Sequence, residues 1–468
     1  MLIEQMYLGC LSQASYVVAD EASGRAIVVD PRRDIDEYLR FAEERDLRIE
    51  AVVLTHVHAD FVPGHSELAA ATGAEVAMGE AAPVEFPIRR LHDGERLELG
   101  DPASGVLVEV AATPGHTPES ITLAVYERGS DPAPAALLTG DTLFIGDVGR
   151  PDLLGASGRT AEEMAGELYR SLRSKILPLP DEVVVYPGHG AGSACGKALS
   201  SDTFSTLGRE RASNYALAKM TEAEFVEAVT QGLSEPPAYF SADVAINRAG
   251  HASFDPTEPL ETLGAAEALR RREEGALLLD VRDGQAFASG HLRGAVNVGL
   301  SGRFAEYAAA VHAPGQEVVL FGSADQVAEA RMRLARVGVD TMTAAVTDPS
   351  QLEAHPEPVV CSSRLDVVEA ARAVGEVAGI QVLDVRNAGE LSAGAVAGSV
   401  HIPLPRLRHR LSELDPSRPV LVYCAGGYRS LVASSLLGSV GFADVSDVLG
   451  GFGAWQSAQV QGGLAGAG

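Results

Sequence analysis

Short apolar runs bounded by turn residues alternate with helical patterns over residues 1 to about 200. Runs rich in β-branched residues predict strands, which lie near Ala26, Glu50, Val106, Ala136 and Glu182. Apolar positions at helical spacing predict helices over residues 35–46 and 160–176. Each of the last four predicted strands ends in a His or an Asp. Because loops at strand ends are held by a rigid sheet, these side chains are well placed to form a metal site.

A polar, Pro-containing stretch over residues 201–259 follows, and its pattern predicts one helix and then a connecting arm. The remainder contains an internal repeat. The segment around Asp280 matches the one around Asp384, and the segment around Gly322 matches the one around Cys424 at nearly the same spacing. Each copy is predicted as strand, helix, strand, loop and helix, which is typical of a parallel, doubly wound α/β sheet. We therefore expect three domains, over residues 1–258, 259–357 and 358–468.

Composition narrows the class of protein. The 468 residues include 64 acidic and 37 basic ones, for a formal net charge of −27. Such a surface repels nucleic acid and anionic lipid, so neither is an expected partner. The N-terminus lacks a basic segment before an apolar run, and no stretch approaches about 18 apolar residues, so we expect neither a secretory signal nor a membrane span. The scattered cysteines suggest neither disulfides nor a CxxC zinc site and fit a reducing cytoplasm: Cys10, Cys195, Cys361 and Cys424.

Imidazole and carboxylate groups gather at the predicted strand ends. The segment THVHADFVPGH follows an apolar strand directly, and TPGHTPES, LLTGDTLF and YPGHG follow later ones. The groups are His56, His58, Asp60, His116, Asp141 and His189. A single His in a loop is usually structural, but a set spread over separate strand ends is hard to obtain by chance. The sequence therefore predicts a metal site.

This pattern resembles the metallo-β-lactamase superfamily, whose hallmark is HxHxDH followed by a distant His, Asp and His. The resemblance covers about the first 200 residues and implies an αββα sandwich. One departure matters, because Phe61 stands where the family has its sixth position, a His. In dinuclear members that His holds the second metal together with the residues matched here by Asp60 and His189. Since Phe cannot bind a metal, these two residues are left without a third partner, and a mononuclear site is favoured over a two-zinc hydrolase.

Two imidazoles and one carboxylate leave about three open octahedral positions, which suits non-haem Fe(II) and oxygen. Within the superfamily, THxHADF with TPGHTPES and TGDTLFIGDVGRPD resembles the persulfide dioxygenases. The resemblance implies one Fe(II) per chain, held by His56, His116 and Asp141. It also implies that His58 stands off the metal beside Asp60 and His189, although spacing alone would make His58 a ligand. The implied reaction converts a thiol persulfide, such as glutathione persulfide, with oxygen and water into the thiol and sulfite.

Two further residues of this segment are candidates for substrate contact. Arg150, just past Asp141 in GDVGRPD, is either a binding group for an anionic carrier thiol or a surface Arg that ends a turn. Cys195 follows His189 on a Gly-rich loop, where it is either a substrate-contacting thiol or a small buried Cys. The remaining candidates are assigned to structure: His65, Cys10 and Cys361.

The segment VLVYCAGGYRS places Cys424 between an apolar strand and a helix. Backbone N–H groups of the loop and the positive end of the helix surround the sulfur, and Arg429 adds a fixed positive charge, which together favour a nucleophilic thiolate. The residues between Cys424 and Arg429 are one fewer than in the phosphatase loop, so the cradle fits a persulfide sulfur. The predicted sulfur-binding residues are Ala425, Gly426, Gly427 and Tyr428.

This last unit resembles the rhodanese sulfurtransferases, with DVRNAGELSAGAVAGSVHIPL as the matching signature. The resemblance implies exchange of sulfane sulfur between thiols, sulfite and thiosulfate through Cys424, with Asp384 and Arg386 as charges that support the fold. The middle copy keeps the signature but has Gly322 in place of the nucleophile and no Arg at the loop end. We therefore expect it to be inactive and to serve as a scaffold or docking module.

The expected protein is an α/β and α+β multidomain enzyme, in which an αββα sandwich precedes two rhodanese-like doubly wound domains. Its expected partners are a thiol persulfide, oxygen, sulfite and thiosulfate, with a homo-oligomer as the default state. One alternative is a thioester hydrolase like glyoxalase II fused to a sulfurtransferase, against which Phe61 argues. Another is a non-enzymatic module that senses or carries sulfur on its rhodanese folds.

Overall fold

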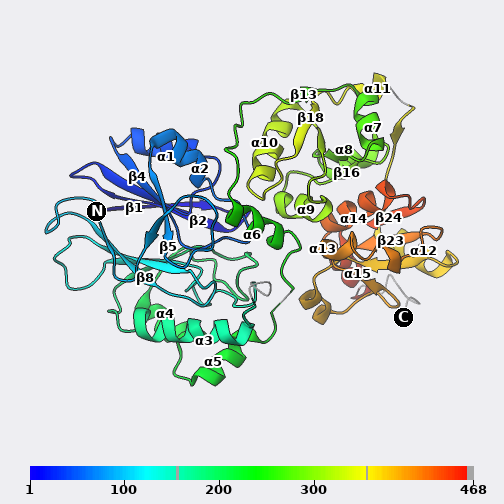
Figure 1. The fold of residues 1–468 in the computed structure, drawn as a ribbon. Helices are drawn as coiled ribbons and strands as arrows, with labels where there is room; N and C mark the ends of the chain where they lie inside the picture. Colours follow the sequence, from blue (N-terminus) through cyan, green and yellow to red (C-terminus); the bar gives the residue numbers. More distant parts are fainter. Residues whose placement is uncertain (154–157, 234, 355–356, 461–468) are drawn as a thin grey trace. The chain divides into compact units, whose positions relative to one another are not determined.

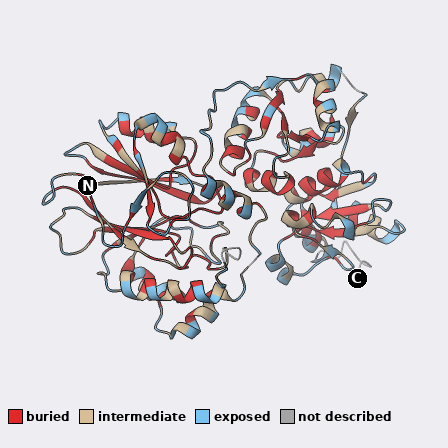
Figure 2. Ribbon diagram, viewed as in Figure 1, coloured by how far each residue is buried: buried red, intermediate tan, exposed pale blue. Residues whose placement is uncertain are grey.

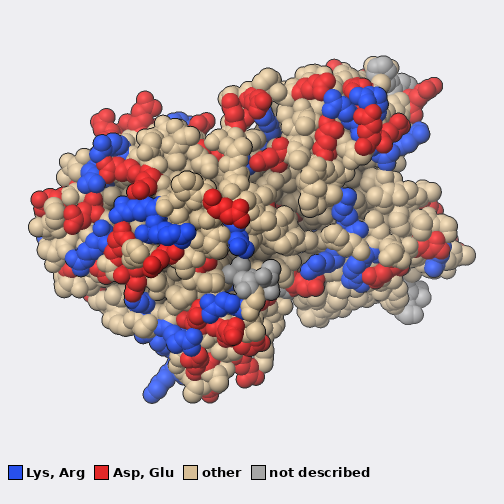
Figure 3. Space-filling view, viewed as in Figure 1, with Lys and Arg blue, Asp and Glu red and all other residues tan. Residues whose placement is uncertain are grey.

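The computed structural model describes residues 1–153, 158–233, 235–354 and 357–460 (Figure 1). The chain forms two compact units, Met1–Pro236 with Phe240–Phe254 and Pro237–Tyr239 with Asp255–Gly468. No helix of the described residues is long and apolar enough to cross a membrane. On the face drawn in Figure 3, Lys and Arg side chains lie interspersed among Asp and Glu.

The first unit contains two sheets whose inner faces share one hydrophobic core. Strands of the first sheet, in spatial order, are β1 (Leu2–Leu8), β2 (Gln13–Asp20), β3 (Arg25–Val29), β4 (Arg48–Leu54), β5 (Glu75–Gly79) and β6 (Arg89–Leu91). Those of the second are β12 (Ser205–Thr206), β11 (Val184–Pro187), β10 (Ala136–Gly140), β9 (Ile121–Tyr126), β8 (Leu107–Ala112) and β7 (Arg96–Glu98). Side chains such as Val18 and Val53 from the first sheet pack against Val108 and Leu123 from the second.

Helices cover the outer face of each sheet. The first sheet is covered by α1 (Asp36–Glu43) and α2 (His65–Thr72), whose Tyr38 and Leu68 share a core with Val28 and Val52. The second sheet is covered by α3 (Ala161–Ser171) and α5 (Glu222–Thr230), whose Leu168 and Phe225 pack on Val185. Further helical segments are η2 (Leu172–Ile176), α4 (Leu207–Ser213), η3 (Tyr215–Leu217) and α6 (Phe240–Ala249). The expected αββα sandwich is therefore present, with burial concentrated in its sheets (Figures 1 and 2).

The second unit contains two parallel sheets with the same strand order, as the repeat predicts. The first, in spatial order, is β13 (Glu261–Thr262), β18 (Met342–Val346), β17 (Val318–Phe321), β14 (Leu277–Asp280) and β16 (Val296–Asn297). The second is β20 (Ser363–Leu365), β24 (Val445–Val448), β23 (Val420–Tyr423), β21 (Gln381–Asp384) and β22 (Val400–His401). A short ribbon also pairs β15 (His291–Leu292) with β19 (Val359–Val360). Such parallel sheets bury both faces, which explains the continuous apolar runs LLLD and VLVY.

Helices surround both parallel sheets. Those of the first copy are α7 (Ala265–Glu273), α8 (Gly284–Ser289), α9 (Phe304–Val311), α10 (Ala324–Ala335) and α11 (Gln351–Ala354). Those of the second are α12 (Val367–Glu376), η4 (Ala388–Ala393), α13 (Leu404–Leu407), η5 (Leu411–Glu413), α14 (Tyr428–Ser439) and α15 (Gly451–Val460). Helix α14, which starts inside the Cys424 loop, inserts Leu431 into the core of the preceding copy beside Phe287. The two copies thus share a core at the helix that carries the predicted nucleophile.

The sequence pattern described the stretch before the repeat incompletely. It predicted one helix and a connecting arm over residues 201–259, whereas the structure places β12, α4, η3, α5 and α6 there, all within the first unit. Helix α5 begins at a capping box, in which the Thr221 hydroxyl and the Glu224 carboxylate each accept from the other's backbone N–H. Helix α6 contacts the loop that carries His58 and Phe61, as described below.

Candidate metal centre and sulfur-transfer loop

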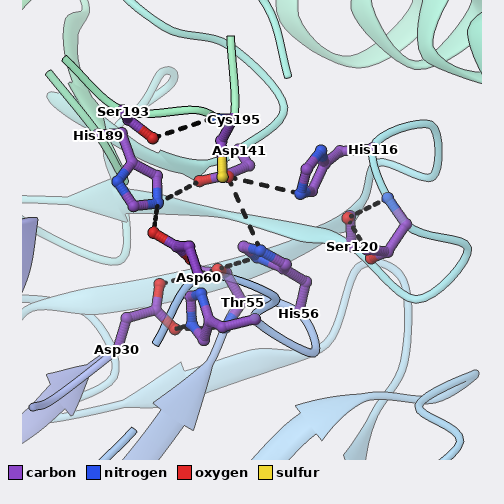
Figure 4. Close-up of polar contacts among 12 residues, drawn as sticks. Asp30, Thr55, His56, Asp60, His116, Ser120, Asp141, His189, Ser193 and Cys195 are labelled. Carbon is purple, nitrogen blue, oxygen red and sulfur yellow. Dashed lines mark hydrogen bonds and ion pairs between the residues drawn. The ribbon is translucent and has the colours of Figure 1, made fainter. Parts of the chain in front are cut away.

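Three predicted ligands converge at the ends of strands from both sheets of the sandwich. His56 follows β4, Asp141 follows β10, and His116 lies in the loop between β8 and β9. The Nε2 atoms of His116 and His56 lie 3.4 and 3.9 Å from Asp141 Oδ2, and all three side chains are buried. Figure 4 shows the two imidazoles and the carboxylate pointing toward one another. The arrangement brings two nitrogen donors and one oxygen donor around a common point, within 4.8 Å of one another.

Hydrogen bonds fix which ring nitrogen each His presents. The Thr55 hydroxyl donates to Asp30 Oδ2 at 2.8 Å, so its oxygen accepts from Nδ1 of His56 at 2.9 Å. Nδ1 of His116 donates to the backbone oxygen of Arg150 at 2.9 Å. Both rings therefore turn Nε2 inward, as metal-ligating histidines do when a neighbour holds the other nitrogen.

Several of the buried nitrogen and oxygen atoms that could bind a metal have no hydrogen-bond partner in the described part of the chain. In the described part of the chain, Nε2 of His56 and both carboxylate oxygens of Asp141 have no hydrogen-bond partner, although they are buried. Burial and the neighbouring imidazoles hold the pKa of His56 well below its usual value, and burial lowers the pKa of His116. Both rings are thus neutral, which is the form that binds a metal. Buried polar atoms without partners are costly, so the set fits a bound cation.

His58 lies apart from this donor set. Its Nε2 contacts Asp30 Oδ1 at 2.9 Å, and against the opposing effect of burial the Asp30 carboxylate raises the pKa of His58. Asp30, at the end of β3, has a φ of +49° and is further held by the backbone N–H of Thr55 at 2.8 Å. Sequence spacing could not reveal this partner, because Asp30 precedes the HxHxD motif by a helix and a strand.

Phe61 and Asp60 occupy the loop after His58. The Phe61 ring is fully buried and lies 4.4 Å from the His58 ring, so it fills space without offering a donor. Asp60 Oδ2 faces Nε2 of His189 at 3.3 Å, and the same nitrogen lies 3.6 Å from Asp141 Oδ1. Asp60 and His189 therefore lie beside the first donor set.

The structure brings Cys195 to this second pair. The donor atoms of Asp60, His189 and Cys195 lie within 4.8 Å of one another, and all three residues are buried. Burial, together with Asp60 and Asp141, raises the pKa of the Cys195 thiol well above its usual value. Without a cation nearby, the thiol is therefore protonated.

Arg150 is buried, and both its side chain and its backbone make hydrogen bonds. Its guanidinium contacts Asp152 at 2.6 and 2.8 Å and donates to the backbone oxygen of Ala194 at 3.1 Å. Its backbone oxygen accepts from His116, and its backbone N–H donates to Cys195 O at 2.9 Å. This geometry favours a residue that positions His116 and the Cys195 loop. Contact of Arg150 with a carrier thiol stays a prediction.

The sequence did not reveal which residue supports the loop that carries His58 and Phe61. Asn247 in α6 is buried, and its amide donates to the backbone oxygens of His58 and Phe61, each at 2.8 Å. The arm therefore clamps the loop that carries the HxHxD motif. Helix α6 contains both polar and apolar residues, so nothing in the local sequence distinguished Asn247 from its neighbours. His65, assigned to structure, is buried and stacks 4.9 Å from Phe86 in the same region.

The Cys424 loop has the shape of an anion cradle. Cys424 is buried at the end of β23, and its sulfur accepts from the backbone N–H of Gly427 at 3.1 Å. Gly427 has a φ of +96°, a conformation that favours Gly and turns the chain into α14. Ala425 and Gly426 are exposed at the mouth of the loop, and Tyr428 donates to the backbone oxygen of Gly299 at 2.5 Å.

Arg429 does not stand alone beside this loop. Its guanidinium binds both carboxylate oxygens of Glu390 at 2.7 Å, a contact that the sequence did not predict. Asp384 and Arg386, expected to support the fold, form a buried pair at 2.6 Å, and Tyr423 donates to Asp384 at 2.7 Å. Glu390 therefore fixes the orientation of the Arg429 charge.

The middle copy closes the space that a nucleophile would need. A Cβ added at Gly322 would lie 2.9 Å from Val281 Cγ2 and 3.2 Å from Gln326 Oε1. Instead of a nucleophile, this copy supplies Tyr307, whose ring lies 5.6 Å from that of Tyr428. The middle copy thus contacts the loop that carries Cys424.

Family models match the sequence of each of the two units. The model of the metallo-β-lactamase superfamily matches residues 8–189, and the rhodanese-like domain model matches residues 264–346 and 366–458. A solved structure of a metallo-β-lactamase from Staphylococcus aureus is 31% identical, with a TM-score of 0.65, over 74% of this chain and 98% of that one. The chain belongs to the metallo-β-lactamase superfamily. Its second unit consists of rhodanese-like domains, the class of sulfurtransferases.

Two curated members of the superfamily differ in reaction. The human mitochondrial persulfide dioxygenase ETHE1 is 28% identical over 229 residues, which are 48% of this chain and 80% of that protein. The hydroxyacylglutathione hydrolase GloC of Haemophilus influenzae is 28% identical over 225 residues, which are 44% of this chain and 98% of that protein. The relatives support a metal-dependent enzyme of this superfamily, joined to sulfurtransferase domains.

Proposed function

We propose that the first unit is an Fe(II)-dependent persulfide dioxygenase and that Cys424 of the second unit transfers sulfane sulfur. The observation that best supports the dioxygenase is the position of His58, which is bound to Asp30. This leaves His56, His116 and Asp141 as the first donor set. A three-donor set of this kind leaves about three open octahedral positions. The likeness to the human persulfide dioxygenase agrees with this choice.

The chain's own groups prepare the site for a thiol persulfide. A bound Fe(II) would supply redox chemistry and vacant coordination positions for the persulfide and oxygen. Thr55 and the Arg150 backbone hold the ligand rings in one orientation, so little reorganisation is needed on binding. The buried Phe61 keeps a further donor out of the site. Overall, RSSH, O₂ and H₂O give RSH, sulfite and two protons.

The dioxygenase proposal is tested by oxygen consumption. Protein loaded with Fe(II) under anaerobic conditions is mixed with glutathione persulfide, and oxygen uptake and sulfite are measured together. We expect one sulfite per oxygen consumed, and loss of both in Asp141→Asn. His92→Ala, a change at an exposed His, is the matched control and should behave as wild type. Purified protein with tightly bound zinc and no oxygen uptake after iron loading would contradict the proposal.

The sulfurtransferase proposal depends on the cradle around Cys424. Its thiolate would attack the outer sulfur of thiosulfate, releasing sulfite and leaving a persulfide on Cys424. Mass spectrometry after thiosulfate treatment should show one added sulfur in wild type and none in Cys424→Ser. Because Cys424 lies in the second unit, Cys424→Ser should retain the oxygen uptake of the first. An unchanged sulfur load in Cys424→Ser would overturn the assignment.

A thioester hydrolase is the second candidate, since the hydrolase GloC is also a relative. The second group of Asp60, His189 and Cys195 would favour it if both groups held zinc for water activation. Hydrolysis of S-lactoylglutathione by the zinc-loaded protein, without oxygen uptake by the iron-loaded protein, would select this function. The reverse pattern would select the dioxygenase.

A further inference from the structure

The middle copy places a tyrosine beside the Cys424 loop. Tyr307 lies in the first turn of α9, which packs against α13 and α14 of the following copy (Figure 1). Its ring lies 5.6 Å from the ring of Tyr428, the first residue of α14. The other end of α9 is also attached to that copy, because Arg408 donates to the backbone oxygen of Val311 at 2.8 Å. Helix α9 is therefore held at both ends against the copy that carries Cys424.

The hydroxyl of Tyr307 is available to a ligand. Among the described residues it makes no hydrogen bond, and the side chain is half-buried. Burial raises the pKa of Tyr307, the Arg429 guanidinium opposes this rise, and Cys424 is also close enough to act on it. A phenol with a raised pKa is protonated at neutral pH, so a hydrogen-bond donor lies beside Arg429 and Cys424.

Arg429 and the loop leave the outer part of a dianionic sulfur donor without partners. Both carboxylate oxygens of Glu390 bind the guanidinium of Arg429 and offset its charge. The backbone N–H of Gly427 faces the Cys424 sulfur and therefore serves the transferred sulfur atom. The sulfonate oxygens of thiosulfate would lie outside this cradle, at the mouth of the loop. They need a donor from another element.

We propose that Tyr307 donates to a sulfonate oxygen of thiosulfate at Cys424, so that both rhodanese-like copies form the site for this oxyanionic sulfur donor. The Cys424 thiolate attacks the outer sulfur, the S–S bond of thiosulfate breaks, and sulfite leaves with the electron pair of that bond. Negative charge on the sulfonate oxygens grows in this step, so the hydrogen bond from Tyr307 strengthens as sulfite leaves. The proton stays on Tyr307. This role rests on the sulfurtransferase function proposed above.

Binding of thiosulfate to Cys424→Ser tests the contact without sulfur transfer, because serine forms no persulfide. In isothermal titration the Kd for thiosulfate should be at least about tenfold higher when Tyr307→Phe is added, as expected for a lost hydrogen bond to a charged group. Tyr126→Phe, at a half-buried tyrosine of the first unit, is the matched control and should leave the Kd unchanged. Melting temperatures should agree among these variants, because Tyr307→Phe keeps the ring and removes no internal hydrogen bond.

Kinetics separate contact with the substrate from support of the fold. In protein that retains Cys424, kcat/KM for thiosulfate should fall about 10- to 100-fold in Tyr307→Phe. Inorganic polysulfide carries no oxygen, and sulfur accepts hydrogen bonds weakly. Loading of Cys424 from polysulfide should therefore stay within about twofold of wild type in Tyr307→Phe. A structural role of Tyr307 would slow the reaction with both donors alike.

The outcomes distinguish this proposal from the proposed function. An unchanged Kd for thiosulfate in Tyr307→Phe, or equal losses with the two donors, would overturn the role of Tyr307 even if Cys424 carries sulfur. Absence of thiosulfate binding to Cys424→Ser would also overturn it. A Kd that depends on Tyr307 would support the contact even if wild type formed no persulfide, a result that would overturn only the sulfurtransferase function.

Discussion

Replacing Asn247 should weaken the attachment of helix α6 to the loop that carries His58 and Phe61. The amide is the donor for two buried backbone oxygens, those of His58 and Phe61. A buried acceptor left without its donor costs about 1–3 kcal/mol. Because water can enter part of the space, we expect Asn247→Ala to destabilise the first unit by about 2–4 kcal/mol. For a unit of this size that corresponds to a melting temperature lower by about 5–15 °C.

Asn247→Asp makes a sharper test, since it keeps the shape and reverses the polarity. A carboxylate would face two carbonyl oxygens, so this variant should be less stable than Asn247→Ala. In both variants iron should bind about 10- to 100-fold more weakly, because the loop that carries the proposed ligand His56 is no longer fixed. Ala245→Ser, at an exposed position of the same helix, is the control and should change neither property.

The assays are differential scanning calorimetry of the full chain, which resolves the units, and competition of the iron-loaded protein with a chelator. The reasoning would be refuted if Asn247→Asp melted within about 1 °C of wild type and kept its affinity for iron. That result would mean that the loop that carries His58 is stabilised by its other contacts, and that α6 contributes little to its stability.

Three further changes test other parts of the structure. Glu390→Gln removes the bidentate partner of Arg429, so transfer of sulfur from thiosulfate should slow about tenfold, measured as kcat/KM for sulfite release. Gly322→Cys, made in Cys424→Ser, should acquire no persulfide by mass spectrometry, because Val281 and Gln326 occupy the space around the new side chain. Burial lowers the pKa of His65 from 6.5 to about 3, so its contribution to stability is present above pH 6.5 and is lost as the pH falls toward 3. Between pH 6.5 and 4 this loss is about 3 kcal/mol, and in chemical unfolding His65→Gln should show a correspondingly shallower dependence of stability on pH.

Local patterns predicted part of the architecture. Apolar runs and their turn residues predicted five strands of the first unit but not β1, β2 or β9, and its αββα arrangement was implied by the family resemblance. The repeat of Asp280 at Asp384 predicted two parallel sheets built from the same unit, which the structure shows. These features depend on neighbours in the chain, since strand and helix periodicity is a property of adjacent residues. The ligand motifs belong to the same class, because each follows its own strand directly.

Contacts between distant segments could not be predicted in this way. His56 and His58 lie two residues apart after β4, and the sequence does not tell which ring faces the other donors. In the structure the His58 ring contacts Asp30, which comes from another strand, whereas the His56 ring is held by the neighbouring Thr55. Glu390 reaches Arg429 from a separate helix, and Asn247 reaches the metal loop from the arm. Each partner is an ordinary polar residue in its local sequence. Its role depends on tertiary packing, which a single sequence does not display.

The shared core between the rhodanese-like copies explains why a copy without a nucleophile is part of the fold. Helix α14 starts within the Cys424 loop, and its Leu431 is buried among side chains of the middle copy. Tyr428, in the first turn of the same helix, donates to Gly299 O of that copy. The position of the helix end at Cys424 therefore depends on the packing of the preceding copy. Removing the middle copy would expose Leu431 and free Tyr428, so we expect the Cys424 loop to lose its geometry without that copy.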